Sequence, residues 1–141
     1  MTALQRRYPS RPESAAVVRR DLRQFALACG YYPYVVDDII VAVGEACSNI
    51  IEHSQTQELF LVDCECQGDC LTISLEDHGH GFAQQSPAET FLPQPRGYGI
   101  HMMRMLMDKV EYVHKPGNGT IVRLEKRKVR EASAMNSFAA E

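Results

Sequence analysis

The chain has 141 residues, of which 45% are hydrophobic and 23% are charged, and its formal net charge is −3. This length supports one domain with a two-layer core, and the composition is typical of a soluble globular protein. The negative charge argues against a dedicated nucleic-acid-binding surface, because such binding depends on neutralising phosphates. No segment reaches the roughly 18 apolar residues of a membrane span, and the N-terminus lacks a signal-peptide core, so we expect a cytoplasmic protein that does not enter a membrane.

Five cysteines, an odd number, favour reduced thiols. Three of them, Cys64, Cys66 and Cys70, precede His78 and His80 and raise the question of a metal site. Cys64 and Cys66 lie two apart on a predicted strand, so their side chains share one face. Zinc sites usually space their cysteines differently, within a turn. We therefore interpret the cysteines as core or surface thiols.

The first predicted elements are an edge strand and a helix. Residues 4–8 can form a short strand. Pro12 suits the first turn of a helix, apolar residues then recur at helical spacing, and Gly30 ends the pattern.

A second helix is predicted from Pro33 to about His53, and its two faces differ. One stripe is apolar and indicates burial. Another stripe is polar and includes Glu45 and Asn49. One face of this helix therefore packs, and the other presents carboxylates and an amide.

The remainder of the chain predicts four strands, a third helix and a long loop. Alternating apolar residues on both sides of Gln67-Gly68-Asp69 indicate a hairpin of residues 58–66 and 70–77. Residues 78–98 show no periodicity, and a loop of this length in a compact chain is usually functional or disordered. The last elements are a helix over 100–107 and strands over 109–114 and 120–126.

This order of elements separates the helices from the strands. It predicts an α+β fold, a two-layer sandwich with a mixed, mainly antiparallel sheet. We expect a single domain over residues 1–126 and a polar C-terminal tail over 127–141. The basic run Lys126-Arg127-Lys128-Val129-Arg130 is interpreted as a solvated strand end and not as a nucleic-acid patch.

The first polar motif is Asp77-x-Gly79-x-Gly81, at the end of a predicted strand. The two glycines allow a sharp turn and a close approach of the backbone. A carboxylate at this position can accept a hydrogen bond from the exocyclic amine of adenine. A plain Asx turn is the alternative if the motif stood alone.

The second motif is Gly97-x-Gly99, which leads directly into a predicted helix. Such a turn directs amide N–H groups and the positive end of the helix dipole toward an anion. Triphosphate oxygens fit this description, and Arg96 could add a charge-assisted contact. A single G-x-G is nevertheless common in loops.

The third motif is Glu45-x-x-x-Asn49, whose side chains project together because they lie one helical turn apart. An amide oxygen suits Mg2+, which takes few protein ligands when phosphates are present. A neighbouring carboxylate can deprotonate an attacking hydroxyl. A solvated helix face is the alternative, and His53, on the same stripe, is equally well explained as a phosphate or lid contact or as a surface histidine.

Together with Gly119-Thr120 near the end of the chain, these three motifs resemble the N, G1, G2 and GT boxes of the GHKL ATPase/kinase superfamily. Within this superfamily, the chain is most similar to the small serine/threonine kinases that act as anti-sigma factors. The resemblance extends from the first helix to the last strand. The matching residues are Glu45, Asn49, His53, Asp77, Gly79, Gly81, Arg96, Gly97, Tyr98, Gly99, Ile100, Gly119 and Thr120.

The resemblance implies a Bergerat-type ATP-binding fold. It implies that Asp77 recognises adenine with help from Thr120, that Asn49 holds Mg2+ and that Glu45 is the catalytic base. The phosphates would lie under a lid between Gly81 and Gly99. The paired histidines around Gly79 and the tail after the last strand depart from the family pattern.

The expected function is that of an anti-sigma-type kinase. With ATP and Mg2+ it would phosphorylate a serine or threonine of a small antagonist protein, and it would also bind a sigma factor, so that phosphorylation switches partners. The resemblance suggests a homodimer. One alternative is a non-catalytic module that binds a partner in a nucleotide-dependent way, and a weaker one is an accessory ATPase domain of a larger complex.

Overall fold

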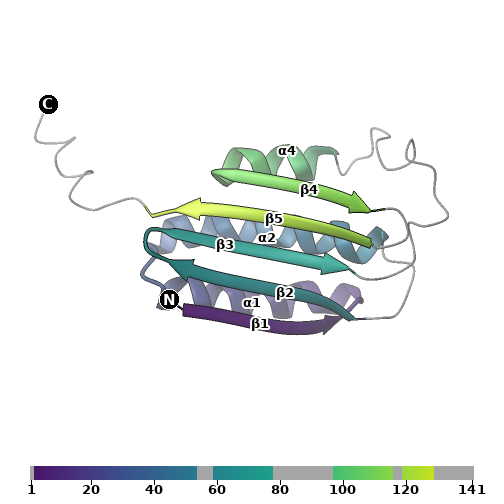
Figure 1. Ribbon diagram of the computed structural model, residues 1–141, viewed down its shortest axis with the longest axis horizontal. Helices are drawn as coiled ribbons and strands as arrows, with labels where there is room; N and C mark the ends of the chain where they lie inside the picture. Colours follow the sequence, from purple (N-terminus) through teal and green to yellow (C-terminus); the bar gives the residue numbers. More distant parts are fainter. Residues whose placement is uncertain (1, 54–58, 78–96, 116–118, 129–141) are drawn as a thin grey trace, which may run out of the picture.

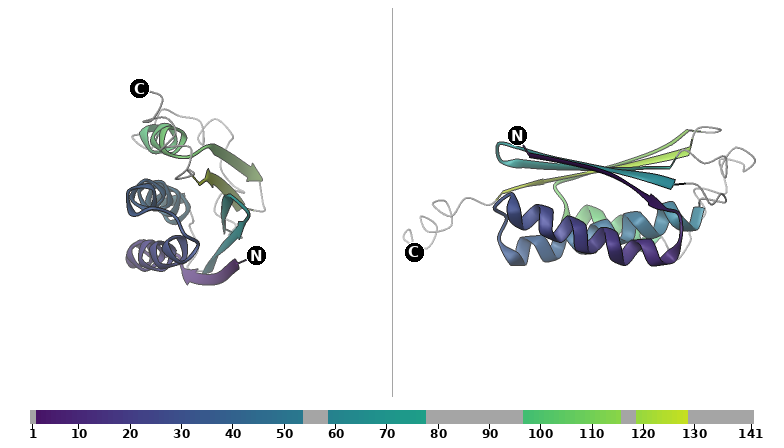
Figure 2. Two further views of the ribbon diagram at one scale, coloured as in Figure 1. Left: turned by 90° about the vertical axis from the view of Figure 1, so that its left-hand side faces the viewer. Right: turned by 90° about the horizontal axis from the view of Figure 1, so that it is seen from below.

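The protein forms a two-layer sandwich, and in the part of the chain that the structure describes three helices cover one face of a five-stranded sheet (Figures 1 and 2). Figure 1 shows a computed structural model, which describes residues 2–53, 59–77, 97–115 and 119–128. In chain order the elements are β1 (Thr2–Pro9), α1 (Pro12–Ala28), α2 (Pro33–His53), β2 (Leu59–Gln67), β3 (Cys70–Asp77), α4 (Gly97–Leu106), β4 (Lys109–Lys115) and β5 (Gly119–Arg127).

The sheet has the strand order β1-β2-β3-β5-β4, and each pairing between described strands is antiparallel. The α+β sandwich predicted from the sequence is therefore confirmed, and the sheet in this part of the chain is antiparallel without a mixed portion. β1 forms one lateral edge. β4, which lies beside α4, forms the other (Figure 2).

Burial follows the alternation of the strands. In β2 and β3 every second residue, from Phe60 to Cys66 and from Leu71 to Asp77, is buried beneath the helices. Residues between them lie on the opposite face, which no described element covers. An antiparallel sheet with one packed and one solvated face produces this pattern.

Helix α2 is the central element of the helical layer and contacts α1, α4, β3 and β5. Its predicted apolar stripe is confirmed, because all of its members are buried: Val36, Ile39, Ile40, Val43, Cys47 and Ile50. The helix spans Pro33–His53 as the sequence predicted. None of the described helices is long and apolar enough to cross a bilayer.

The ends of α1 also agree with the sequence. Pro12 is its first residue, and Gly30, just after its end, has a φ of 95°, a conformation that favours glycine. The other predicted boundaries fall within a few residues of the observed ones, with α4 beginning at Gly97 and not at residue 100. Most of the predicted loop, residues 78–96, and most of the predicted tail, residues 129–141, lie outside the described residues.

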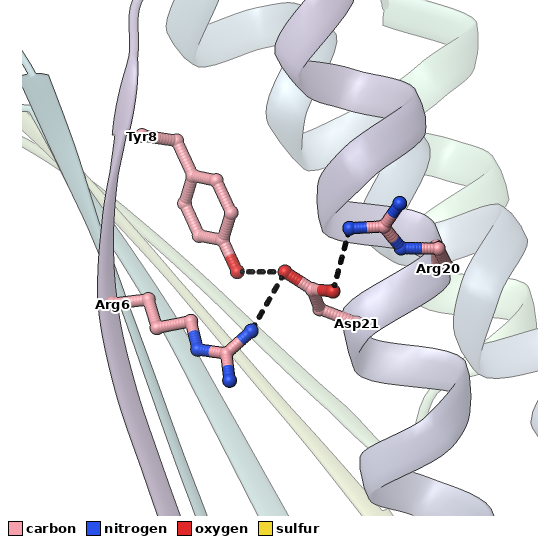
Figure 3. Close-up of polar contacts among 4 residues, drawn as sticks. All are labelled: Arg6, Tyr8, Arg20 and Asp21. Atoms are coloured by element: carbon pink, nitrogen blue, oxygen red, sulfur yellow. Dashed lines mark hydrogen bonds and ion pairs between the residues drawn. The ribbon is translucent and has the colours of Figure 1, made fainter.

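A buried carboxylate joins α1 to the edge strand β1 (Figure 3). The Tyr8 hydroxyl donates a hydrogen bond of 2.8 Å to Oδ2 of Asp21, and Nη1 of Arg6 lies 3.1 Å from the same oxygen. Nη2 of Arg20 is 3.4 Å from Oδ1. Burial raises the pKa of Asp21, but the hydrogen bonds from Tyr8 and Arg6 and the charge of Arg6 outweigh burial, so the net pKa is lowered. Burial, followed by Asp21, raises the pKa of Tyr8.

The sequence did not predict this contact. Asp21 falls on the buried side of α1 with Val18, Leu22 and Phe25, where helical periodicity alone would favour another apolar residue. A carboxylate is tolerated there because three donors surround it.

We predict that Asp21→Ala lowers the free energy of unfolding by about 1–3 kcal/mol, because the buried Tyr8 hydroxyl loses a charged acceptor. Asp37, which forms an exposed ion pair with Arg23, is the matched control, and Asp37→Ala should cost less than about 1 kcal/mol. Because the folded pKa of Asp21 is lowered, its stabilisation is present above the unfolded-state value and is lost as the pH falls through the folded value. Urea unfolding of both variants between neutral and acidic pH tests this, and equal losses in the two variants would contradict it.

Candidate functional site

The three sequence motifs meet at one end of the sandwich. The C-terminal end of α2, the end of β3, the start of β5 and the start of α4 all lie on the same side (Figure 1, right). The antiparallel pairing of β3 with β5 brings the end of one strand to the beginning of the other, although they are more than 40 residues apart in the chain. The four elements form three walls of a candidate site.

The first wall is made by Asp77 and Thr120, which are direct partners in the β3–β5 register. Their relative exposures are 0% and 1%, and both face the helical layer. A buried carboxylate beside a buried hydroxyl is costly unless both groups are hydrogen-bonded. The pair suits a flat polar ligand that offers a donor group, as the exocyclic amine of adenine does.

The second wall is the polar stripe of α2. Asn49 is only 4% exposed, which the sequence did not predict for a residue on the polar stripe, and Glu45 is partly exposed. Within the described part of the chain, the side-chain nitrogen Nδ2 of Asn49 has no hydrogen-bond partner. A buried amide of this kind is suited to a ligand that accepts a hydrogen bond from its N–H group or that binds its oxygen.

The third wall is the first turn of α4, which lies directly against Glu45. A Cβ atom placed on Gly99 would lie 2.6 Å from Oε2 of Glu45, closer than carbon and oxygen approach. Glycine at this position leaves room for the carboxylate, and a larger residue would require the end of the flexible Glu45 side chain to move. The acid of one motif and the glycine turn of another are therefore in contact.

Lys126 contributes to this arrangement, although the sequence analysis had assigned it to a solvated run. Its Nζ donates a hydrogen bond to the carbonyl oxygen of Leu106, the last residue of α4. The alternation of β5 could have predicted this position, because every second residue points to the helical side: Thr120, Val122, Leu124 and Lys126. Lys126 thus holds the end of the helix whose first turn faces Glu45, and its cation also suits a helix C-terminus.

The other predicted site residues are described only in part. Gly97 and Tyr98 form the first turn of α4 with Gly99, and Ile100 packs partly buried against the core. His53 is the last residue of α2, and its side chain is outside the described part. Gly79, Gly81 and Arg96 are also outside it.

The cysteines lie within or beside the core. Cys47, Cys64 and Cys66 are buried, and Cys64 and Cys66 share the helical face of β2, as their spacing predicted. Burial raises the pKa of Cys47 to about 12, which makes its thiol a poor nucleophile. No group of three metal-ligating side chains occurs among residues that the structure describes.

Comparison with known proteins identifies the family of this chain. Residues 8–126 match the family described as the histidine kinase-like ATPase domain, and the chain belongs to this family. The match spans every described element from the end of β1 to β5.

Individual relatives of the chain include anti-sigma factors and serine-protein kinases. The chain is 33% identical over 99 residues to an anti-sigma F factor of Thermoanaerobacter sp. strain X514, an alignment that covers 64% of this chain and 69% of the relative. It is 28% identical over 127 residues to the serine-protein kinase RsbW of Bacillus pumilus strain SAFR-032, covering 77% and 76% of the two chains.

Solved structures support the fold. The RsbU and RsbW domains of Rv1364c from Mycobacterium tuberculosis superpose with a TM-score of 0.72 at 23% identity, covering 92% of this chain and 33% of that larger one. The SiaB–SiaC complex of Pseudomonas aeruginosa gives a TM-score of 0.58 at 12% identity, with 87% and 88% covered.

We predict that Gly99→Ala displaces the Glu45 carboxylate without unfolding the protein. Alanine favours a helix over glycine by about 1 kcal/mol, and the atom that must move is the end of a flexible side chain. ATP turnover should fall about 10- to 100-fold, since small displacements of reacting groups cost this much. Gly44→Ala is the control, because its added methyl would meet only the Arg19 side chain. Thermal unfolding and single-turnover kinetics measure both effects, and full activity of Gly99→Ala would show that the contact has no role in turnover.

Proposed function

We propose that this protein is an ATP-dependent serine/threonine kinase of the anti-sigma type, in which Glu45 is the catalytic base, Asn49 the Mg2+ ligand and Asp77 with Thr120 the adenine site. The observation that carries the proposal is the contact of Glu45 with Gly99, which places a carboxylate against the glycine turn that would hold the phosphates. Family membership supports ATP binding. The relatives named as serine-protein kinases support the reaction class.

The proposed roles follow from the chemistry of each group. Asp77 is buried, and its carboxylate can accept the hydrogen bond of the adenine amine, while the Thr120 hydroxyl can bond a ring nitrogen or a bridging water. The N–H groups at the start of α4 can bind phosphate oxygens. Gly79, Gly81, Arg96, Gly97, Tyr98 and Ile100 are proposed to line the nucleotide site, and His53 to approach the phosphates.

The described residues fit a magnesium ion. Asn49 offers one amide oxygen, and the buried Nδ2 of the same group could donate to a phosphate oxygen or to a water. When bound, Mg2+ would neutralise charge on the transferred phosphoryl group. Glu45, one helical turn away, can take the proton from the attacking hydroxyl of the protein substrate.

The partners are proposed from the relatives. An anti-sigma F factor and serine-protein kinases among them support a small antagonist protein as the substrate and a sigma factor as the sequestered partner. We also propose a cytoplasmic location. A homodimer is also proposed, and the uncovered face of the sheet offers a surface for it. We propose the boundaries 1–126 for the catalytic domain, with 127–141 as a tail outside it.

We predict that Asp77→Asn weakens the binding of a non-hydrolysable ATP analogue about 10- to 100-fold, because a charged acceptor for the adenine amine is lost. Asp63→Asn is the control, since Asp63 lies on the uncovered face of the neighbouring strand. Isothermal titration calorimetry on both variants gives the comparison. Unchanged affinity of Asp77→Asn would remove adenine recognition from this pocket.

We predict different defects for two residues of one helix face. Glu45→Ala should keep nucleotide affinity and lower phosphoryl transfer by about two to four orders of magnitude, the usual contribution of a positioned general base. Asn49→Ala should weaken Mg2+-dependent nucleotide binding itself, because Asn49 would supply the protein's ligand to the metal that accompanies the nucleotide. Ser48→Ala, exposed on the same helix, is the control.

Labelled ATP, Mg2+ and candidate antagonist proteins provide the measurement. If the wild-type protein binds one of these candidate proteins only with ATP and transfers phosphate to none of them, the kinase proposal fails and the non-catalytic binding module takes its place.

A further inference from the structure

Positive charge is concentrated in the first two elements of the chain. Residues 2–22 contain five arginines and two acidic residues, a formal charge of +3 in a chain whose total is −3. The arginines are Arg6, Arg7, Arg11, Arg19 and Arg20, and all except Arg19 are exposed. The site described above makes no use of them, because β1 and α4 lie at opposite lateral edges of the sandwich.

Two of these arginines are held in place by one buried anion. The side chain of Asp21 is 7% exposed, whereas those of Arg6 and Arg20 are 56% and 66% exposed. Each guanidinium uses one nitrogen for Asp21 and has five N–H groups in total. Two cations therefore share one carboxylate, with Arg6 and Arg20 on opposite sides of it (Figure 3). The N–H groups that do not contact Asp21 leave each guanidinium able to bind a further carboxylate.

No described strand pairs with the outer side of β1, the strand that carries Arg6. β1 pairs with β2 on one side and is the outermost strand of the sheet, so alternate residues of Thr2–Pro9 direct N–H and C=O groups away from the sheet. An eight-residue edge is long enough to pair with an extended segment of another chain.

A cavity lies at the end of this edge. It has a volume of about 210 Å³ and is lined by Tyr8, Pro9, Arg11, Glu13, Ser14 and Val17. Val17 is an exposed apolar residue on α1. The cavity is large enough for one aliphatic side chain of a segment that follows β1.

We propose that the edge of β1, with Arg6, Arg20 and this cavity, binds an acidic, extended segment of a protein partner by strand addition. The main-chain groups of β1 would hold the segment, each of the two arginines would bind one of its carboxylates, and the cavity would take an apolar side chain. A long polyanion fits less well, because Asp63 and Glu65 of β2 lie on the uncovered face directly beside β1. The proposal does not depend on the kinase activity proposed above.

A short labelled peptide of alternating glutamate and valine is the probe, with fluorescence anisotropy as the measurement. We expect a Kd below about 1 mM, at least tenfold weaker binding by the Arg6→Gln/Arg20→Gln double variant, and weaker binding at high salt. The Arg104→Gln variant, which changes an exposed residue of α4, should bind the peptide as the wild type does. Hydrogen exchange should show new protection of β1 amides with the peptide.

Two altered peptides separate strand addition from simple charge attraction. A central proline removes a main-chain donor and should abolish binding, and glutamine in place of glutamate should reduce it at least tenfold. If the double variant fails to fold, Arg20→Gln alone replaces it, since Arg20 makes the longest of the three contacts with Asp21.

Four outcomes would overturn the proposal. They are no binding at about 1 mM peptide, equal binding by the double variant, equal binding of the proline peptide, and tighter binding of a DNA duplex or of anionic phospholipid vesicles than of the peptide.

Discussion

The arrangement of the molecule depends on α2, which packs against the sheet on one side and against α1 and α4 on its flanks. Its apolar stripe is buried against β3 and β5, and its flanks contact α1 and α4. The helix cannot rotate without exposing Ile39, Val43 or Ile50. Because burial of the apolar stripe sets the orientation of α2, it also sets the positions of Glu45 and Asn49 on the neighbouring face of the helix.

The same helix explains why the remaining site residues converge. Asp77 is the last residue of β3, Thr120 is the second residue of β5, and Gly99 lies in the first turn of α4, beside α2. Lys126, at the far end of β5, bonds the last carbonyl of α4. The β5 strand therefore contributes to the site at both of its ends, once through Thr120 and once through the placement of α4. A change in the β3–β5 register would disturb both contacts together.

The two lateral edges of the sheet have different chemistry. At the β4 edge, α4 brings Gly99 against Glu45 in the proposed nucleotide site. At the β1 edge, a buried carboxylate and two exposed guanidiniums join the strand to α1. Edge strands are often protected by charge, and Arg6 serves this purpose even without a partner.

The sequence by itself determined the fold class and the three motifs, because apolar periodicity and short polar motifs are local properties of the chain. The ends of α2, the alternation of β2 and β3, and the glycine after α1 could all be predicted from neighbours a few residues apart. The joint role of Asp77 and Thr120 was implied by the family resemblance, and the alternation of β5 indicates the inward position of Lys126. Tertiary structure alone decided the contact of Glu45 with Gly99 and the burial of Asn49 and Asp21. Each of these joins residues that are distant in sequence or depends on which side of an element is covered, and such contacts depend on how helices and strands pack rather than on local preference.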